Sequence, residues 1–236
     1  MRNVTTIALK EFKSYLASPT AYIVTGIFLI ATGLLFSSSQ STYVETSITG
    51  FLQSGSLLLL LLSAALTMRL LAEERKLGTI ELLLTAPVRD SEVIMGKFLG
   101  ALSLLGLMLL LTLYYPLLLI IFGDPDFGPI VTGYLGLLLL GCSALAVGIF
   151  ASSLSSNQIV AAVVSTGILL ALWFLGIGAN FLPEAFGEVL GYFSLSYYFP
   201  DFMRGIIDTR GIIYYLSITA LFIFLAIRSL EYSRWS

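Results

Sequence analysis

The sequence predicts an all-α integral membrane protein that crosses the bilayer six times. The 236 residues are 58% hydrophobic and 11% charged, with a mean hydropathy of +0.97. Soluble domains are closer to half apolar and a quarter charged. Apolar stretches long enough to cross a bilayer as helices recur along the chain. The long charged interruption at residues 73–90 lies between two of these stretches, so we expect it in water on one side of the membrane.

Residues 1–20 precede the first long apolar stretch and are predicted to form an amphipathic interfacial helix. Lys10 and Lys13 lie on one side of the helical projection, and apolar residues recur on the opposite arc. This pattern is typical of a helix in the membrane interface, although Glu11 interrupts the arc. The arc consists of Val4, Ile7, Ala8, Phe12, Tyr15 and Leu16. The alternative is a plain charged flank to the first span, and a cleaved signal peptide is not expected.

Length and hydropathy place six predicted spans at residues 21–39, 51–72, 98–122, 130–154, 159–182 and 211–230. The Tyr114-Tyr115-Pro116 step is expected to kink the third span. Basic residues favour the cytoplasmic side. With the N-terminus inside, all of the twelve Lys and Arg residues except Arg204 and Arg210 lie there, so both termini and residues 73–90 are predicted to be cytoplasmic.

Residues 181–210 are predicted to lie on the outer side. Aromatic residues alternate there with carboxylates, which suits short helices at the level of the lipid headgroups. The alternative is a loop that packs on the ends of the spans. Two small-residue pairs, Gly96/Gly100 and Ala144/Gly148, have the spacing of close helix packing, although glycine is frequent in membrane helices for other reasons.

No catalytic or metal site is expected in this chain. It has no His, and its single Cys142 lies in a predicted span, so neither a disulfide within the chain nor a thiolate metal cluster can form. The stretch most similar to a nucleotide-binding P-loop is residues 91–98. It lacks the first glycine of that motif and its final Ser or Thr. The predicted spans contain no Asp or Glu, which argues against an intramembrane hydrolase and an ion-coupled carrier.

Residues 73–90 are the best candidate for a docking surface. A helix is favoured from Glu73 to Leu84, with Gly78 its one weak position, and Pro87 ends it. Asp90 is expected to cap the next helix, which runs on into the third span. The charges alternate in sign, and the apolar residues at 80 and 82–84 need a partner surface. The alternative is a solvated loop.

This segment resembles a known family. The pattern Glu74-Arg75-x-x-Gly78-Thr79-Ile80-Glu81-Leu82-Leu83-Leu84-x-x-Pro87-Val88-x-x-x-Glu92-x-x-x-Gly96-Lys97 is similar to the cytoplasmic segment of ABC-2 type transporter permeases. Two further stretches resemble their gliding-motility-associated (GldF-like) branch: Lys10-Glu11-Phe12-x-x-Tyr15-x-x-Ser18-Pro19-x-Ala21-Tyr22 and Arg204-Gly205-x-x-Asp208-x-Arg210.

The resemblance implies a six-span subunit of the bacterial inner membrane without its own ATPase. Such a subunit pairs with a second permease, identical or related, and receives a cytoplasmic ATP-binding cassette subunit that binds ATP and magnesium. This chain then holds no cofactor. Residues 73–90 would be the coupling helix, residues 1–20 the connecting or gate helix, and residues 181–210 the outer re-entrant helices. The implied ATPase contacts are Glu74, Arg75, Gly78, Thr79, Glu81, Leu82 and Pro87.

The function implied by the resemblance is to couple ATP hydrolysis in a separate subunit to export or to force transmission. The substrate stays open, as does a periplasmic accessory partner, and no nucleic acid is expected. One alternative is a membrane scaffold of a gliding or envelope complex that transmits force and moves no solute. A second alternative is an intramembrane enzyme, which the residue content disfavours.

Overall fold

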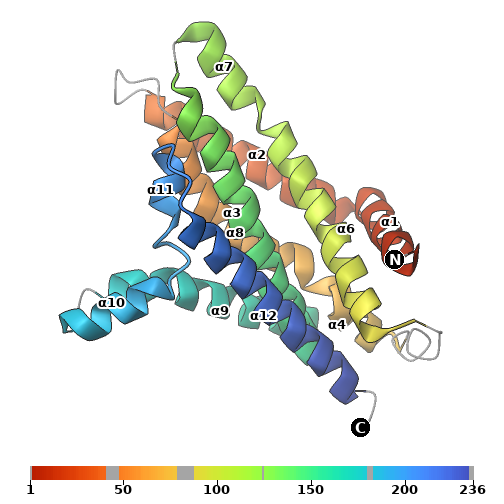
Figure 1. Cartoon of the computed structure of the whole chain (residues 1–236). Coiled ribbons are helices and arrows are strands. Elements are labelled where there is room, and N and C mark those ends of the chain that lie inside the picture. Colours follow the sequence, from red (N-terminus) through yellow and green to blue (C-terminus); the bar gives the residue numbers. More distant parts are fainter. Residues whose placement is uncertain (1, 41–47, 79–87, 124, 180–182, 234–236) are drawn as a thin grey trace.

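The computed structural model describes residues 2–40, 48–78, 88–123, 125–179 and 183–233. Six helical segments in these ranges are long and apolar enough to cross a membrane (Figure 1), as the sequence predicts. They are Pro19–Ser37, Thr49–Lys76, Asp90–Phe122, Phe127–Leu154, Gln158–Gly178 and Thr209–Tyr232. On which side of the membrane each end lies stays a prediction.

Some of these segments consist of two helices. The chain begins with α1 (Arg2–Ala17) and α2 (Pro19–Gln40), which meet at Ser18. The second segment is α3 (Thr49–Thr67) followed by α4 (Arg69–Lys76), and the third is α6 (Asp90–Leu111) followed by α7 (Tyr114–Phe122). The remaining helices are α8 (Phe127–Leu154), α9 (Gln158–Ala179), α10 (Glu184–Tyr192), α11 (Phe199–Met203) and α12 (Thr209–Ser233).

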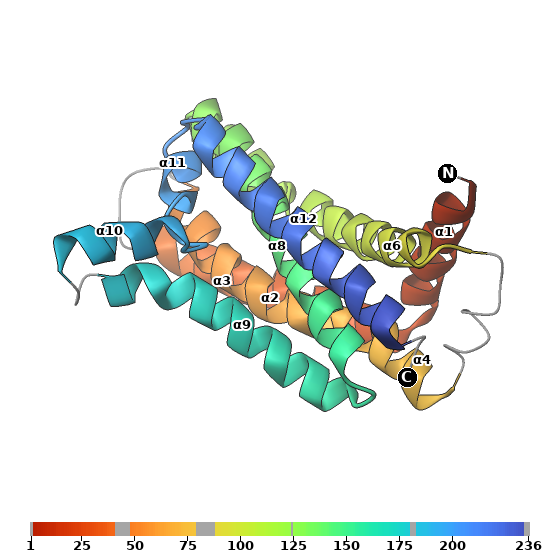
Figure 2. The same cartoon turned by 60° about the horizontal axis from the view of Figure 1, so that its bottom comes forward.

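Helix α8 lies at the centre of the bundle, where it packs against α3, α6, α9 and α12 (Figures 1 and 2). In its candidate span 78% of the residues are buried, against 17% in those of α2 and α9. Small residues on α8 explain this position, because they let neighbouring helices approach closely. Four of its glycines each face a different side chain: Gly133 faces Leu52, Gly136 faces Phe202, Gly141 faces Leu105 and Gly148 faces Thr67.

The third span is interrupted at Thr112 and Leu113, next to the predicted kink. Pro116 has no N–H to donate to the carbonyl of Thr112, four residues earlier. The backbone N–H of Tyr115 donates to that carbonyl at 3.0 Å, and the hydroxyl of Tyr134 on α8 donates to it as well, at 2.9 Å. The break therefore lies where the proline removes one helical hydrogen bond, and a tighter backbone turn and a side chain of the central helix both bond to the carbonyl concerned.

Short helices are present in the segment predicted to lie outside, as α10 and α11. The turn between them packs on the ends of two spans, since the N–H of Leu195 donates to the carbonyl of Leu172 at 3.0 Å and Tyr215 Oη donates to the carbonyl of Leu195 at 2.8 Å. Residues 181 and 182 of the predicted segment lie outside the described part of the chain. The position of this segment relative to the lipid headgroups stays a prediction.

Candidate functional site

Residues 73–90 run from the second half of α4 to the first residue of α6. Residues 79–87 lie outside the described residues, and with them the predicted contacts Thr79, Glu81, Leu82 and Pro87. Helix α4 ends at Lys76, and Gly78 follows with a φ of +69°, a left-handed conformation that favours glycine. The helix predicted from Glu73 to Leu84 therefore does not continue through Gly78, which terminates α4 instead of only weakening it, and residues 79–84 of that prediction lie outside the described residues.

The C-terminal end of residues 73–90 leads into α6. The predicted cap, Asp90, is the first helical residue, and Arg89 occupies the cap position. The reason is that the carboxylate of Glu92 accepts the backbone N–H of Arg89 at 3.1 Å, as in one half of a capping box. Asn3 of α1 donates to the same carboxylate at 3.2 Å. The helix then runs through Gly96 and Lys97 into the third span, as predicted.

Lys97 connects three helices at this end of the bundle. It is 2% exposed, and its ammonium lies 2.9 Å from the carboxylate of Glu11 on α1 and 2.7 Å from that of Glu74 on α4. A buried ammonium requires such partners because it has lost its water. We call these three residues the Lys97 cluster. It ties α1 to both flanks of residues 79–87.

Arg69, the first residue of α4, fixes the junction between α1 and α2. Its guanidinium donates to Ser18 Oγ at 2.6 Å and to Thr20 Oγ1 at 2.7 Å, and it lies 4.7 Å from the ring centre of Tyr15. Tyr15 Oη donates to the carbonyl of Leu66 at 2.8 Å. Burial raises the pKa of Tyr15, with Arg69 opposing the shift, so the phenol stays protonated as this hydrogen bond requires.

A cavity of about 460 Å³ opens between α1, α4 and α6. Its walls carry charges of both signs: Lys10, Arg69 and Lys97 against Glu11, Glu73 and Glu74. Opposite charges in one wall give no net preference for an anion or a cation. The cavity is therefore a polar recess lined by α1, by the C-terminal part of α4 and by Lys97 of α6.

The apolar arc of α1 faces α6. A Cβ on Gly96 would lie 2.6 Å from Ile7 Cγ2, and one on Gly100 would lie 2.6 Å from Glu11 Cβ. The two glycines thus let α1 lie directly on the backbone of α6. The partner of the arc is another helix of the same chain, where a membrane surface was predicted. Leu9 is 60% exposed on the other side of α1, and whether α1 lies in the membrane interface stays a prediction.

Comparison with known proteins assigns the family. A family model described as ABC-2 family transporter protein matches residues 5–194, from α1 through α10. The chain belongs to the ABC-2 transporter family. It is thus a multi-pass membrane protein and the permease subunit of an ABC-2 transporter. Membrane subunits of this family are typically non-catalytic, with the ATPase in a separate subunit. No curated protein matches the chain.

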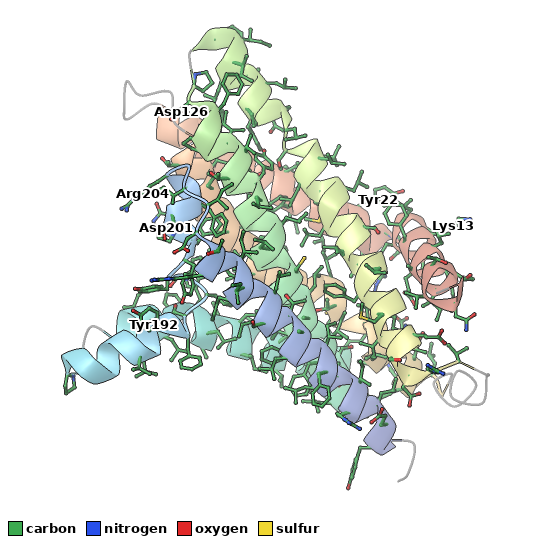
Figure 3. The ribbon with its side chains drawn as sticks, viewed as in Figure 1. Lys13, Tyr22, Asp126, Tyr192, Asp201 and Arg204 are labelled. Atoms are coloured by element: carbon green, nitrogen blue, oxygen red, sulfur yellow. The ribbon has the colours of Figure 1, made fainter. Side chains whose placement is uncertain are left out.

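The structure places the predicted residues of the ABC-2 permease in different surroundings. Glu74 belongs to the Lys97 cluster, and Arg75 follows it in α4. On α1, Tyr15 is buried and Phe12 half-buried, whereas Lys10 lines the cavity and Lys13 is exposed (Figure 3). In α8, Ala144 is buried and Gly148 faces Thr67.

Sequence reasoning missed the residues that hold this end of the permease together. Glu11 was noted as an interruption of an apolar arc, and both Glu11 and Lys97 stood in the family patterns, but no pairing between them was predicted. A carboxylate on the apolar face of a helix is itself a signal, because it requires a cationic partner once that face is buried. Ser152 of α8, described below, had no such signal.

Metal-ligating side chains are scattered in the described part of the permease. No group of three or more His, Cys, Asp or Glu residues within it comes together to hold a metal ion. The thiol of Cys142 is buried in α8. The contacts where α1, α4 and α6 meet are hydrogen bonds and ion pairs between helices.

Proposed function

We propose that this permease subunit couples ATP hydrolysis in a separate ATP-binding cassette subunit to export, or to force transmission, across a bacterial inner membrane. The Lys97 cluster is the observation that supports this most strongly. It joins the helix before residues 79–87 to the helix after them and to α1. A push on that segment would therefore move three helices together.

Residues 73–90 serve as the coupling segment in this proposal. The ATPase contacts are Glu74, Arg75, Gly78, Thr79, Glu81, Leu82 and Pro87. Closure of two ATPase subunits around ATP displaces the segment, and α4 and α6 follow as packed helices. The displacement needs contacts that differ between the nucleotide states of the ATPase. ATP and magnesium bind to the ATPase, and the permease chain holds no cofactor.

The proposal also includes the orientation of the subunit in the membrane and its assembly with partners. Helix α1, the facing ends of α4 and α6 and the C-terminal end of α12 lie at one end of the bundle (Figure 1). These segments carry most of the basic residues of the chain, so we place the N-terminus and C-terminus in the cytoplasm. Helices α2 and α9 are little buried, and their apolar faces meet lipid or a second permease subunit, identical or related. A periplasmic accessory protein would meet the opposite end, where α10 and α11 lie.

A second candidate function is a membrane scaffold that transmits force and moves no solute, in a gliding or envelope complex. The similarity of residues 10–22 and 204–210 to the gliding-motility-associated branch favours it. This alternative shares the ATPase contact and differs only in what crosses the membrane. A transport assay with the reconstituted complex separates the two functions.

Charge reversal in the coupling segment tests the proposal. Glu81→Lys should lower co-purification of the ATPase, or its stimulation by the permease, by about tenfold, because a paired interface charge becomes repulsive. Insertion into the membrane should be unchanged. The matched control is Glu231→Lys, at the end of α12 and outside the segment. Wild-type co-purification and stimulation in Glu81→Lys would count against the assignment.

A further inference from the structure

The second span changes from α3 to α4 at Met68, where a side chain of α8 enters the backbone hydrogen bonding. In an uninterrupted helix the N–H of Leu71 would donate to the carbonyl of Thr67. Here the N–H groups of Leu71 and Ala72 both donate to Ser152 Oγ, each at 3.1 Å. The hydroxyl of Ser152 in turn donates to the carbonyl of Met68 at 3.0 Å. One side chain thus makes three hydrogen bonds across the break.

Other buried groups also hold the break in place. Tyr15 Oη donates to the carbonyl of Leu66, which the N–H of Leu70 would reach in a continuous helix. Thr67 lies against Gly148, one helical turn before Ser152 on the same face of α8. Leu71, Ala72 and Ser152 are all 0% exposed. Without the hydroxyl of Ser152, two buried N–H groups would depend on the backbone alone.

The residues at the break give only a weak local reason for it: Thr67 Oγ1 donates back to the carbonyl of Ser63 at 2.8 Å, which can bend a helix slightly. Thr67, Met68 and Arg69 include neither proline nor glycine, the usual causes of a sharp change in a helix. The stronger cause that the contacts show is the side chain of Ser152, inserted from α8. Ser152 belongs to the most buried helix of the bundle, so its position is fixed by the core. Helix α4 is short, and it leads directly into residues 79–87.

We propose that Ser152 is the positioning residue of a hinge between α3 and α4. Its hydroxyl accepts with two lone pairs and donates through a rotating O–H, so it can keep the break bonded while α4 tilts. Helix α4 then acts as a lever, pivoting at Met68 and held at its other end by Glu74 in the Lys97 cluster. This inference rests on the proposed function, since it names how movement of the coupling segment reaches the second span.

Hydrogen exchange in the isolated permease, reconstituted in lipid nanodiscs, tests the hinge bonds. Ser152→Ala should raise the exchange rate of the amides at residues 71 and 72 by about tenfold, because each loses its acceptor. Ser153→Ala is the matched control: Ser153 is adjacent and equally buried, and its hydroxyl donates within α8 to the carbonyl of Phe150 at 2.7 Å. Unchanged or slower exchange in Ser152→Ala would overturn the proposal.

The coupling readout separates a hinge from a static kink. In the complex with the ATPase, Ser152→Ala should still co-purify with the ATPase, while the stimulation of ATP turnover by the permease falls by about tenfold. Ser153→Ala should retain full stimulation. If Ser152→Ala speeds amide exchange at residues 71 and 72 but leaves the stimulation of ATP turnover at the wild-type level, Ser152 only fills a fixed break. The proposal would then fail. A wild-type permease that binds no ATPase would refute the proposed function instead, with hydrogen exchange still deciding on the hinge bonds.

Discussion

At the scale of single residues, the ammonium of Lys97 holds α1, α4 and α6 together. Moving a lysine out of water costs several kcal/mol, and only close, charge-assisted hydrogen bonds offset this. The distances to Glu11 and Glu74, 2.9 and 2.7 Å, are those of such bonds. Because both carboxylates come from other helices, the free energy gained from these two charge-assisted hydrogen bonds depends on the packing of all three helices.

Removal of this ammonium is the first prediction. Lys97→Met leaves the carboxylates of Glu11 and Glu74 facing each other, and we expect the free energy of unfolding to fall by about 3 kcal/mol. Chemical unfolding of the purified subunit in detergent measures the change. Lys13→Met, which replaces an exposed lysine of α1, should stay within about 0.5 kcal/mol of the wild type. A Lys97→Met variant as stable as Lys13→Met would contradict the role given to the cluster.

The Lys97 cluster shows where sequence reasoning stops at this scale. Lys97 and Glu11 are 86 positions apart, and hydrophobic periodicity indicates which face of a helix is buried but not what covers it. The family pattern includes Glu74 and Lys97 without stating that they touch. Their pairing depends on how α1 and α4 dock on α6, which only the folded structure shows.

At the scale of elements, the contact between α1 and α6 depends on two glycines one turn apart. The sequence marked Gly96 and Gly100 as a close-packing pair, and the structure identifies α1 as the helix that lies on them. The apolar arc of α1 would look the same for a helix lying on lipid, because both partners are apolar. The pattern therefore predicted an amphipathic helix but could not choose its partner.

The second prediction adds a methyl group where α1 lies on the backbone of α6. A Cβ on Gly100 would meet Glu11 Cβ at 2.6 Å and the carbonyl oxygen of Ala8 at 3.2 Å, so Gly100→Ala should displace α1 and destabilise the subunit by about 2 kcal/mol. Hydrogen exchange over residues 2–17 should rise. Gly106→Ala, in the same helix with nothing within 4 Å, should be neutral or stabilising. Equal behaviour of the two variants would show that α1 does not depend on this contact.

The two helix breaks differ in how far the sequence could predict them. Pro116 predicts the break in the third span, because proline has no N–H to donate to the preceding turn. The break at Met68 has no such residue, and it coincides with the hydroxyl that Ser152 inserts from a distant part of the chain. Local sequence therefore predicts a break with a local cause and misses one that tertiary contact produces.

At the scale of the whole molecule, hydropathy was sufficient to predict the six candidate membrane-crossing helices of the described residues. It did not indicate their arrangement, because every span is apolar and lipid offers no contrast between a buried and an exposed helix. The small residues of α8 do mark the helix that neighbours can approach most closely, and α8 is the central one. Figure 3 shows Lys13 toward one end of the bundle. The opposite end carries Asp126, Asp201 and Arg204.

The most direct test of the account is site-specific photo-crosslinking from the coupling segment in native membranes. A photoreactive residue replaces Leu77, which is 66% exposed at the end of α4, or Phe122, which is 84% exposed at the end of α7 on the opposite side of the bundle. The account predicts an ATP-binding cassette ATPase crosslinked at position 77 and absent at position 122. An ATPase that crosslinks elsewhere and leaves position 77 bare, or no ATPase at either position, would contradict it.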